Sequence, residues 1–592
     1  MKFTFNHLAC ATIIALSLQA CTVTQESVEM DKPVVYQVFT RLFGNDTGNN
    51  INNGDRSQNG CGTMRAFTPN ALDEIKKLGI THIWYTGIIE HATQTDYSSY
   101  GIARDHHAIV KGKAGSAYAI KDYYDVDPDI ADSVPARMKE FEDLVKRTHK
   151  AKMKVIIDFV PNHVARQYHS DACPQGVEDL GASDDTTQHF SPRNNFYYFP
   201  GEAFQADFDL QQDEAQPYSE QPARATGNDV FSSFAHHDDW YETIKLNYGV
   251  DYINGRAPHF DPIPSTWQKM LDILLFWAGK GVDGFRCDMA EMVPAEFWGW
   301  AIPQVKEKYP KIIFIAEIYG PDAYRRYIHE GRFDYLYDKV GLYDTLRAVT
   351  CGNADADAIT SCWQAVDDIR PHMLSFLENH DEQRIASDHF AGSAERGKAA
   401  MIVAATFSTG PVMIYFGQEL GERGMDDEGF SGRDGRTTIF DYWTVNSISR
   451  WRNKNKFDNS QLTAEEIENR KFYATLLNLC SNESAIGQGE FYDLMYVNPP
   501  SPTFNPKKQY AYLRHYDRTT LIIVVNFDDA PATVDVNIPE HAFKHYRMNS
   551  RLKIRATNLL NGETVPISFS PQKPTHVDVP ANSGVILKIK TR

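Results

Sequence analysis

One stretch of the sequence decides the fold, and it reads Val282-Asp283-Gly284-Phe285-Arg286-Cys287-Asp288. A short run of this kind between helical patterns is typical of a buried strand in a parallel sheet. Side chains two residues apart on a strand share one face, so Arg286 and Asp288 are expected to point the same way. A charged pair on the inner face at the end of a strand predicts a functional site there.

Further runs of this type alternate with helical patterns along the chain. They cover residues 34–39, 80–85, 154–158, 312–317, 333–337, 374–377 and 412–416. Alternating strands and helices predict βα units and a parallel sheet. Together with the stretch quoted above, these units predict an α/β protein with a (β/α)8 TIM barrel, whose functional residues lie at the carboxyl ends of the strands.

The chain has 592 residues, which is too long for one compact core. The gap between the third and fourth strands is too long for a βα connection, so residues 164–260 are predicted to form an inserted subdomain after strand three. After the barrel, which we assign to residues 34–488, the pattern changes to alternating strands. This pattern predicts a C-terminal antiparallel β-sandwich domain over residues 489–592.

The N-terminus has the pattern of an export signal. An apolar run over residues 8–18 is too short to cross a membrane as a helix, and it is followed by Leu18-Gln19-Ala20-Cys21. These four residues resemble a bacterial lipobox, which implies a signal peptide over 1–20, a lipid anchor on Cys21 and a tether over 21–33. A plain secretory signal is the alternative. Because Thr22 and not Asp follows Cys21, we expect the anchor in the outer membrane of the bacterial cell envelope, on the cell surface or the periplasmic face.

Charge and cysteine content limit the classes of partner. The formal net charge of −18 disfavours nucleic acid, because phosphates would be repelled, but does not disfavour a neutral sugar. Cys10 lies in the signal and Cys21 takes the lipid, which leaves six of the eight cysteines. Cys351 and Cys362 are the only close pair among these, and the sequence leaves open whether they form a disulfide.

Four short motifs contain the residues that carry chemistry. They are Asp158-Phe159-Val160-Pro161-Asn162-His163, Gly284-Phe285-Arg286-Cys287-Asp288, Phe314-Ile315-Ala316-Glu317 and Asn379-His380-Asp381. In this order, and at the ends of predicted barrel strands, they resemble the signature motifs of the α-amylase superfamily of retaining glycoside hydrolases (family 13). The resemblance covers nearly all of residues 34–592 and implies an α-glucan substrate.

The resemblance implies a role for each carboxylate. Asp288 matches the family's nucleophile, and the guanidinium of Arg286 is expected to favour its ionised form. Glu317 matches the acid/base, and the apolar strand before it is expected to raise its pKa. Asp381 matches a third carboxylate that binds sugar hydroxyls and stabilises the transition state. Asp158 matches a structural support that is expected to pair with Arg286.

Three further residues resemble the family's sugar contacts. His163 and His380 match histidines that donate or accept hydrogen bonds at sugar hydroxyls. Tyr118, four residues before Asp122, matches a tyrosine that stacks on the same sugar, although Ala117 replaces the usual glycine before it.

Calcium is the cofactor that the resemblance implies, in a structural role. Asn162 matches one ligand of the family's calcium, and the backbone carbonyl of Met292 stands where another would be. An Asp- and Asn-rich loop over residues 45–50 could hold a second ion or form a plain turn. Glu291 replaces the lysine that many α-amylases carry three residues after the nucleophile, so leaving-group recognition is expected to differ.

An α-amylase acting on α-1,4 chains is the leading hypothesis. A neopullulanase or cyclomaltodextrinase is less favoured, because strand one begins only 13 residues after Cys21 and leaves no room for the extra N-terminal domain usual in those proteins. An α-glucan transglycosylase is not excluded. A non-catalytic glycan-binding lipoprotein is the alternative of a different class, and intact carboxylates at 288, 317 and 381 argue against it.

Overall fold

The computed structural model describes residues 32–427 and 432–590. Its centre is a closed barrel of parallel strands, in which neighbours follow the order β1-β18-β17-β16-β15-β14-β5-β2. The strands are β1 (Val34–Phe39), β2 (His82–Thr86), β5 (Lys154–Phe159), β14 (Gly284–Cys287), β15 (Ile313–Ala316), β16 (Tyr335–Tyr337), β17 (Met373–Phe376) and β18 (Val412–Tyr415). The predicted (β/α)8 barrel is confirmed, and each strand end lies within two residues of its predicted position.

Helices surround the barrel. They are α1 (Thr40–Phe43), α2 (Arg56–Asn59), α3 (Pro69–Lys76), α4 (Arg137–Lys150), α5 (Ser265–Gly279), α6 (Ala295–Lys308), α7 (Tyr324–His329), α8 (Asp344–Thr350), α9 (Ile359–Ala365), α10 (Lys398–Thr406), α11 (Asn446–Arg452) and α12 (Ala464–Asn482). On α4 the buried residues Phe141, Leu144, Val145 and Thr148 recur at helical spacing, which places one apolar face against the barrel. The strands are covered on both faces as a result, and β1 is buried along its whole length.

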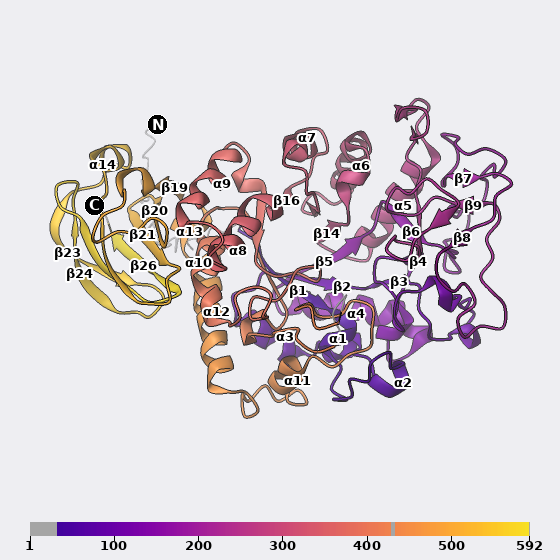
Figure 1. The fold of residues 1–592 in the computed structure, drawn as a ribbon, viewed down its shortest axis with the longest axis horizontal. Coiled ribbons are helices and arrows are strands. Elements are labelled where there is room, and N and C mark those ends of the chain that lie inside the picture. The colour runs from indigo at the N-terminus through magenta and orange to yellow at the C-terminus, as the bar shows by residue number, and fades with distance from the viewer. Residues whose placement is uncertain (1–31, 428–431, 591–592) are drawn as a thin grey trace, which may run out of the picture.

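The chain between β5 and α5 forms the inserted subdomain. It consists mainly of loops and short strands: β6 (His163–Ala165), β7 (Tyr198–Phe199), β8 (Gln205–Ala206), β9 (Ala223–Arg224), β10 (Phe234–Ala235), β11 (Thr243–Lys245), β12 (Val250–Asp251) and β13 (Ala257–Pro258). Glu220 pairs with Arg166 and Arg224, at 2.9 Å in each case. This buried ion-pair group stabilises a segment with little regular secondary structure. The subdomain lies at the opposite end of the molecule from the C-terminal domain (Figure 1).

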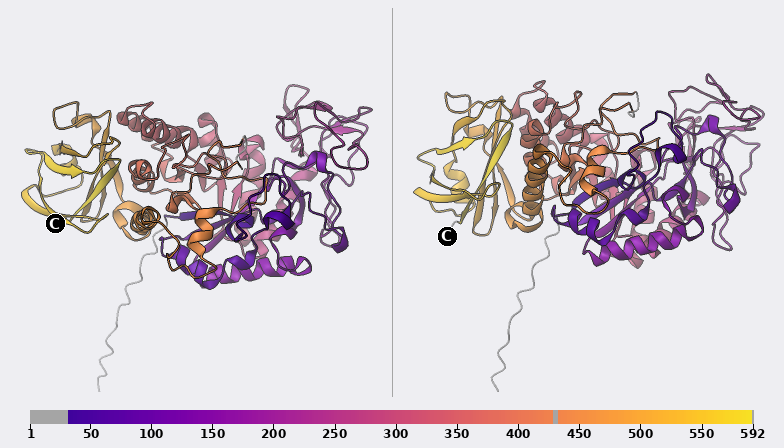
Figure 2. Two further views of the ribbon diagram at one scale, coloured as in Figure 1. Left: turned by 60° about the horizontal axis from the view of Figure 1, so that its bottom comes forward. Right: turned by 90° about the horizontal axis from the view of Figure 1, so that it is seen from below.

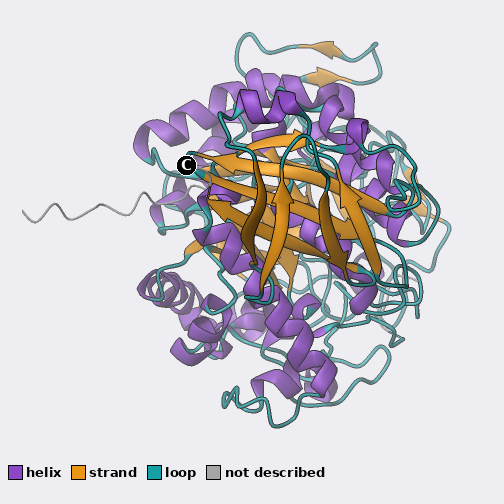
Figure 3. Cartoon of the chain, turned by 90° about the vertical axis from the view of Figure 1, so that its left-hand side faces the viewer, coloured by secondary structure: helices purple, strands orange, loops and turns teal. Residues whose placement is uncertain are grey.

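The C-terminal domain follows α13 (Ser484–Gly487) and is antiparallel, as predicted. Its six-stranded sheet has the order β19-β20-β21-β26-β23-β24, and β22 pairs with β25 in a second sheet. The strands are β19 (Glu490–Asp493), β20 (Gln509–Tyr516), β21 (Thr519–Asn526), β22 (Ala532–Val536), β23 (Arg551–Asn558), β24 (Thr564–Phe569), β25 (Thr575–Val579) and β26 (Ser583–Lys590), and α14 (Glu540–His545) connects β22 to β23. The sheet packs against helices on one side of the barrel (Figures 2 and 3).

Arg514 on β20 joins this domain to the barrel. Its guanidinium is almost fully buried, and it donates hydrogen bonds to the backbone carbonyls of Phe407, Ala485 and Ile486 at 2.8–3.2 Å. Arg514 therefore connects the sheet to the C-terminal end of α10 and to α13, in each case through main-chain carbonyls.

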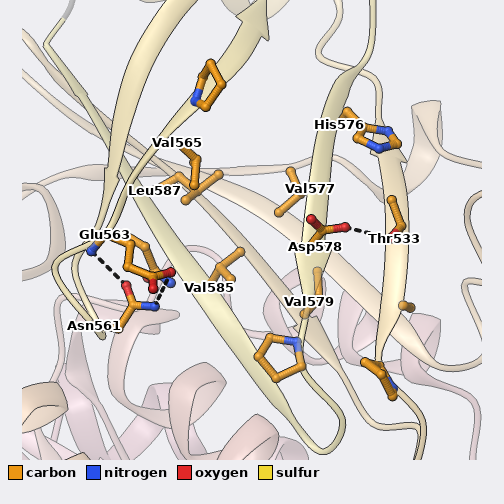
Figure 4. A pocket seen from close by; sticks show the side chains of 15 residues that line it. Thr533, Asn561, Glu563, Val565, His576, Val577, Asp578, Val579, Val585 and Leu587 are labelled. Carbon is orange, nitrogen blue, oxygen red and sulfur yellow. Dashed lines mark hydrogen bonds between the residues drawn. The ribbon is translucent and has the colours of Figure 1, made fainter.

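A cavity of about 780 Å³ lies within the C-terminal domain, between the β22–β25 pair and the larger sheet (Figure 4). Val565, Val577, Val585 and Leu587 form its apolar wall. None of the residues that the sequence singles out for catalysis lines it, so this cavity is separate from the candidate site.

Two sequence-based expectations concern cysteines and membranes. All six cysteines in the described part of the chain are free, so Cys351 and Cys362 form no disulfide. Their thiols instead donate to the carbonyl of Phe390 at 3.2 Å and to the hydroxyl of Thr345 at 3.2 Å, respectively. Over the same residues, no helix combines the length and apolarity needed to span a bilayer. Cys21 and the signal peptide lie outside the described residues.

Candidate active site

The predicted site residues meet at the carboxyl ends of the barrel strands. Asp158 lies on β5 and Arg286 beside it on β14, where the strand register pairs the two positions. Asp288 follows β14 directly and Glu317 follows β15 directly. Asp381 lies in the loop after β17. Parallel strands of a barrel all end at one rim, so carboxylates that are more than 220 positions apart in sequence converge.

Arg286 is the centre of this group. Its Nη1 lies 2.7 Å from Oδ1 of Asp288 and 3.6 Å from Oδ1 of Asp158, and its Nη2 lies 2.7 Å from Oε2 of Glu317. The guanidinium is fully buried. Because a single cation serves several acidic groups here, repulsion and desolvation favour protonation of part of the set.

Glu317 is held by donors on two sides. The amide of Met289 donates to its Oε2 at 2.8 Å, and the hydroxyl of Tyr319 donates to its Oε1 at 2.7 Å. Burial raises the pKa of Glu317, and repulsion from Asp288 acts in the same direction, while Arg286 and the two donors oppose the increase. A raised pKa suits a carboxyl group that must deliver a proton at neutral pH.

Asp288 is also buried, and burial raises its pKa. Arg286 opposes that increase through its charge and its hydrogen bond, so it acts in the direction expected from the sequence, although burial outweighs it. Hydrogen bonding with Glu317 further lowers the pKa of Asp288.

Asp381 differs from the other two because 34% of its side chain is exposed, so solvent reaches it through the mouth of the barrel. Burial by the surrounding protein, followed by repulsion from Glu317 and Asp288, nevertheless raises the pKa of Asp381 well above its usual value. The ring of His380 lies beside it, with Nε2 at 3.1 Å from Oδ2 of Asp381. Asp381 therefore faces the opening where a sugar would enter.

Both predicted histidines are neutral. Burial lowers the pKa of His163 to about 3 and lowers the pKa of His380 well below its usual value. Nε2 of Gln37 donates to Nδ1 of His380 at 2.8 Å, so the proton of His380 lies on the nitrogen that faces Asp381. His163 packs against Trp240 of the inserted subdomain, with ring centroids 5.2 Å apart.

Tyr118 completes one wall of the site. Its ring stacks on His380 with centroids 4.9 Å apart and an angle of 20° between the planes. Its hydroxyl donates to Oδ1 of Asp158 at 3.4 Å, and the indole of Trp84 donates to Oδ2 of the same carboxylate at 2.9 Å. Burial raises the pKa of Asp158 to about 7. Asp158 thus lies between the ring of Tyr118 and the guanidinium of Arg286.

The residues around Asn162 do not fit the calcium that the family resemblance implies. The buried ammonium of Lys245 donates to Oδ1 of Asn162 and lies 2.6 Å from Oδ1 of Asp229. It also donates to the carbonyl of Met292 at 3.3 Å. A cation of the chain itself contacts the oxygens that calcium would need, and a divalent ion cannot share that space with an ammonium. Asn162 therefore does not fit as a calcium ligand in this structure.

The loop over residues 45–50 does not supply a free ligand set either. Asp46 pairs with Arg452 at 2.6 Å, and the amide of Asn45 donates to the carbonyls of Asn59 and Trp443. The plain-turn alternative accounts for this loop.

One functional residue, Tyr319, was missed in the sequence, and Glu291 was singled out only as the replacement of a lysine. Tyr319 lies two residues after Glu317, and the period of two along an extended chain is the signal that could have indicated a contact. Glu291 accepts hydrogen bonds from the amides of Tyr319 and Gly320, at 3.1 and 3.0 Å. Glu291 thereby fixes the loop that carries Tyr319, a position at which many α-amylases have a lysine.

Comparison with known proteins agrees with this geometry. The model of the alpha amylase catalytic domain matches residues 37–472. Alpha-amylase MalA of Haloarcula japonica is 25% identical over 404 residues, which cover 67% of this chain and 45% of that protein. The alpha-amylase of Streptomyces lividans is 24% identical over 569 residues, which cover 90% of this chain and 56% of the relative. The chain thus spans about half the length of these relatives.

Solved structures share the fold. The noncanonic maltogenic alpha-amylase AmyB from Thermotoga neapolitana superposes with a TM-score of 0.58 at 19% identity, covering 95% of this chain and 99% of that one. The strand order, the site at the carboxyl rim and the match over residues 37–472 lead to one assignment. The chain belongs to the α-amylase family.

Proposed function

We propose that this protein is a retaining glycoside hydrolase that cleaves α-1,4-glucosidic bonds in starch-like glucans or maltooligosaccharides. The observation that carries the proposal is the contact of one guanidinium, Arg286, with both Asp288 and Glu317, at 2.7 Å in each case. Two carboxyl groups in unlike proton states across one bond are what glycoside hydrolysis with retention requires.

The proposed reaction has two steps. Glu317 donates its proton to the glycosidic oxygen while a carboxylate oxygen of Asp288 attacks the anomeric carbon, so the bond to the leaving sugar breaks as a glycosyl ester forms. Glu317, now ionised, then takes a proton from water, and the resulting hydroxide attacks the anomeric carbon. This step releases Asp288 as a carboxylate and returns the proton to Glu317.

The remaining residues bind and orient the sugar. Asp381 lies at the opening and is proposed to accept hydrogen bonds from sugar hydroxyls, which strengthen as charge develops at the anomeric carbon. Tyr118 offers a ring face, and His380, whose Nδ1 already accepts from Gln37, is proposed to donate from Nε2 to a sugar hydroxyl. His163 is proposed to contact a hydroxyl of the same sugar. Leaving-group contacts are proposed to differ from those of α-amylases with a lysine at position 291.

Hydrolysis of soluble starch tests the proposal directly. We expect reducing ends to appear, and we expect NMR of the first products to show the α-anomer, because two displacements at one carbon restore its configuration. Products that begin as the β-anomer would exclude Asp288 as a nucleophile. Longer oligosaccharides accumulating from short ones would instead indicate a transglycosylase, and binding without any products would indicate a glycan-binding protein.

We further propose that Cys21 carries a lipid that anchors the enzyme in the outer membrane. The support is the Leu18-Gln19-Ala20-Cys21 sequence followed by Thr22. A single acyl chain holds a protein only weakly, whereas anchors with two or more chains hold firmly. Such an anchor would keep the enzyme beside the cell that takes up its products.

A further inference from the structure

A second cluster of carboxylates lies apart from Asp288, Glu317 and Asp381. It consists of Glu90 on β3 (Ile89–His91), Asp122 and Asp125 on β4 (Ile120–Val126), and Asp171 at the start of the inserted subdomain. One oxygen from each of the four lies within 4.8 Å of all the others. Glu90 pairs with Asp122 across the two strands, and the register is irregular on both sides of Glu90, which brings Asp125 to the same place.

Glu90 is the member that lacks a partner within the protein. Its side chain is 2% exposed, and among the described residues no group donates a hydrogen bond to its buried Oε2. A buried carboxylate oxygen without a donor is costly, because neither water nor protein replaces its lost hydration.

Among the described residues, two cations lie near this cluster, and each is paired with one carboxylate. Arg137 pairs with Asp125, whereas Lys121, which is next to Asp122 in sequence, pairs with Asp105 at 2.9 Å. Within the described part of the chain, Arg137 is the one cation that forms an ion pair with a member of the cluster.

Asp122 is already held in place by the inserted subdomain. Its Oδ2 accepts from the amides of Asp171 and Ala172 at 2.9 and 3.0 Å, and its Oδ1 accepts from the hydroxyl of Ser170 at 2.6 Å. These bonds fix the distance between the β3–β4 hairpin and the subdomain without using Glu90. The cluster is therefore preformed, and it includes the buried Glu90, with its unpartnered Oε2, and the exposed Asp171.

We propose that Glu90, Asp122, Asp125 and Asp171 form a binding site for a divalent cation, and that the cation is calcium. The donor set contains only oxygen, which favours calcium or magnesium over zinc and other softer metals. Calcium accepts irregular geometry and six to eight oxygen ligands, so water entering beside the exposed Asp171 can complete its coordination. Magnesium demands a regular octahedron that four carboxylates spread over up to 4.8 Å do not provide.

The position of this site gives the cation a structural role. Tyr118, which stacks on His380, lies four residues before Asp122 on the same segment. A cation at the cluster joins this segment to the inserted subdomain, which carries Trp240 against His163. Calcium would thus connect two walls of the active site at a place different from Asn162.

The test is calcium binding to the full chain after removal of metal with a chelator. We expect calcium chloride to give a saturable heat of binding and to raise the unfolding temperature, and we expect magnesium chloride to do so much less. Glu90→Gln should remove this shift, yet its metal-free form should be at least as stable as the metal-free wild type, because the amide is neutral and can donate hydrogen bonds to the carboxylates around it. Asp171→Asn, at an exposed position where folding is not at risk, should weaken calcium binding by about tenfold or more, since affinity follows the charge of the ligands.

Asp46→Asn is the matched control, because it removes an acidic group from the other Asp-rich loop. The control should keep the full calcium response. Absence of a response in the wild type would overturn the proposal, and so would a full response in both Glu90→Gln and Asp171→Asn. A magnesium response equal to that of calcium would overturn the assignment of the ion.

Discussion

Nη2 of Arg286 lies 2.7 Å from Oε2 of Glu317, the carboxyl group to which we assign the proton. The same guanidinium holds Asp288 through Nη1. Arg286 therefore sets the relative positions of the proposed nucleophile and the proposed acid, and it lowers the pKa of both. Burial and repulsion from Asp288 together outweigh Arg286, so the pKa of Glu317 lies above its usual value.

Replacing Asp288 by Asn should lower kcat by roughly 10⁴-fold or more, because the amide is nearly isosteric but cannot form the glycosyl ester. Binding of maltooligosaccharides, measured by calorimetry, should persist. Activity near that of the wild type in a clean preparation would rule out Asp288 as the nucleophile.

Glu317→Gln should reduce hydrolysis of natural glucans by roughly 10²–10⁴-fold, the usual contribution of a general acid. Substrates with good leaving groups need little protonation and should lose far less in their first step. The comparison uses burst kinetics on aryl glycosides beside starch. Equal losses on both substrates would contradict the acid role.

Tyr319→Phe should extend activity to higher pH. The hydroxyl of Tyr319 donates to Glu317 and lowers its pKa, so its removal raises the pKa and keeps the acid protonated at higher pH. The basic limb of the kcat/KM profile should therefore move upward. Tyr324→Phe is a suitable control, because Tyr324 lies on α7 and makes none of the contacts described above for Glu317. An unchanged or lowered basic limb in Tyr319→Phe would contradict this account of Glu317.

Lys245→Met should destabilise the protein by roughly 3–5 kcal/mol, because it leaves Asp229 and Asn162 without their buried cation. The free energy of unfolding is measured in urea. Lys111→Met, which removes a more exposed lysine from its 3.2 Å pair with Glu242, should cost much less. A loss no larger than that of the control would show that Lys245 is not essential to this junction.

Cys21→Ala should release the enzyme from membranes with unchanged specific activity, because the proposed anchor lies before the barrel begins at Val34. The measurement is the distribution of activity between membrane and soluble fractions after a salt wash. Activity that stays with the membranes would refute the lipid anchor.

The barrel could be predicted because its strands are short, apolar and regularly spaced, and the gathering of Asp288, Glu317 and Asp381 followed from parallel strands ending at one rim. Lys245 could not be placed in this way. It reaches Asn162 across 83 positions of a subdomain that consists mainly of loops, and no periodicity reports such a contact. Glu90 was missed for a related reason, because its neighbours depend on an irregular register between β3 and β4.

Arg514 has a consequence for how the molecule is organised. Three main-chain carbonyls, those of Phe407, Ala485 and Ile486, depend on its one buried guanidinium for their hydrogen bonds. A chain cut at residue 488 would lose the guanidinium that these carbonyls contact and would uncover the apolar surface of α10. The C-terminal sheet is thus a piece of the barrel's outer wall rather than a detachable module, and both are expected to melt in one cooperative transition.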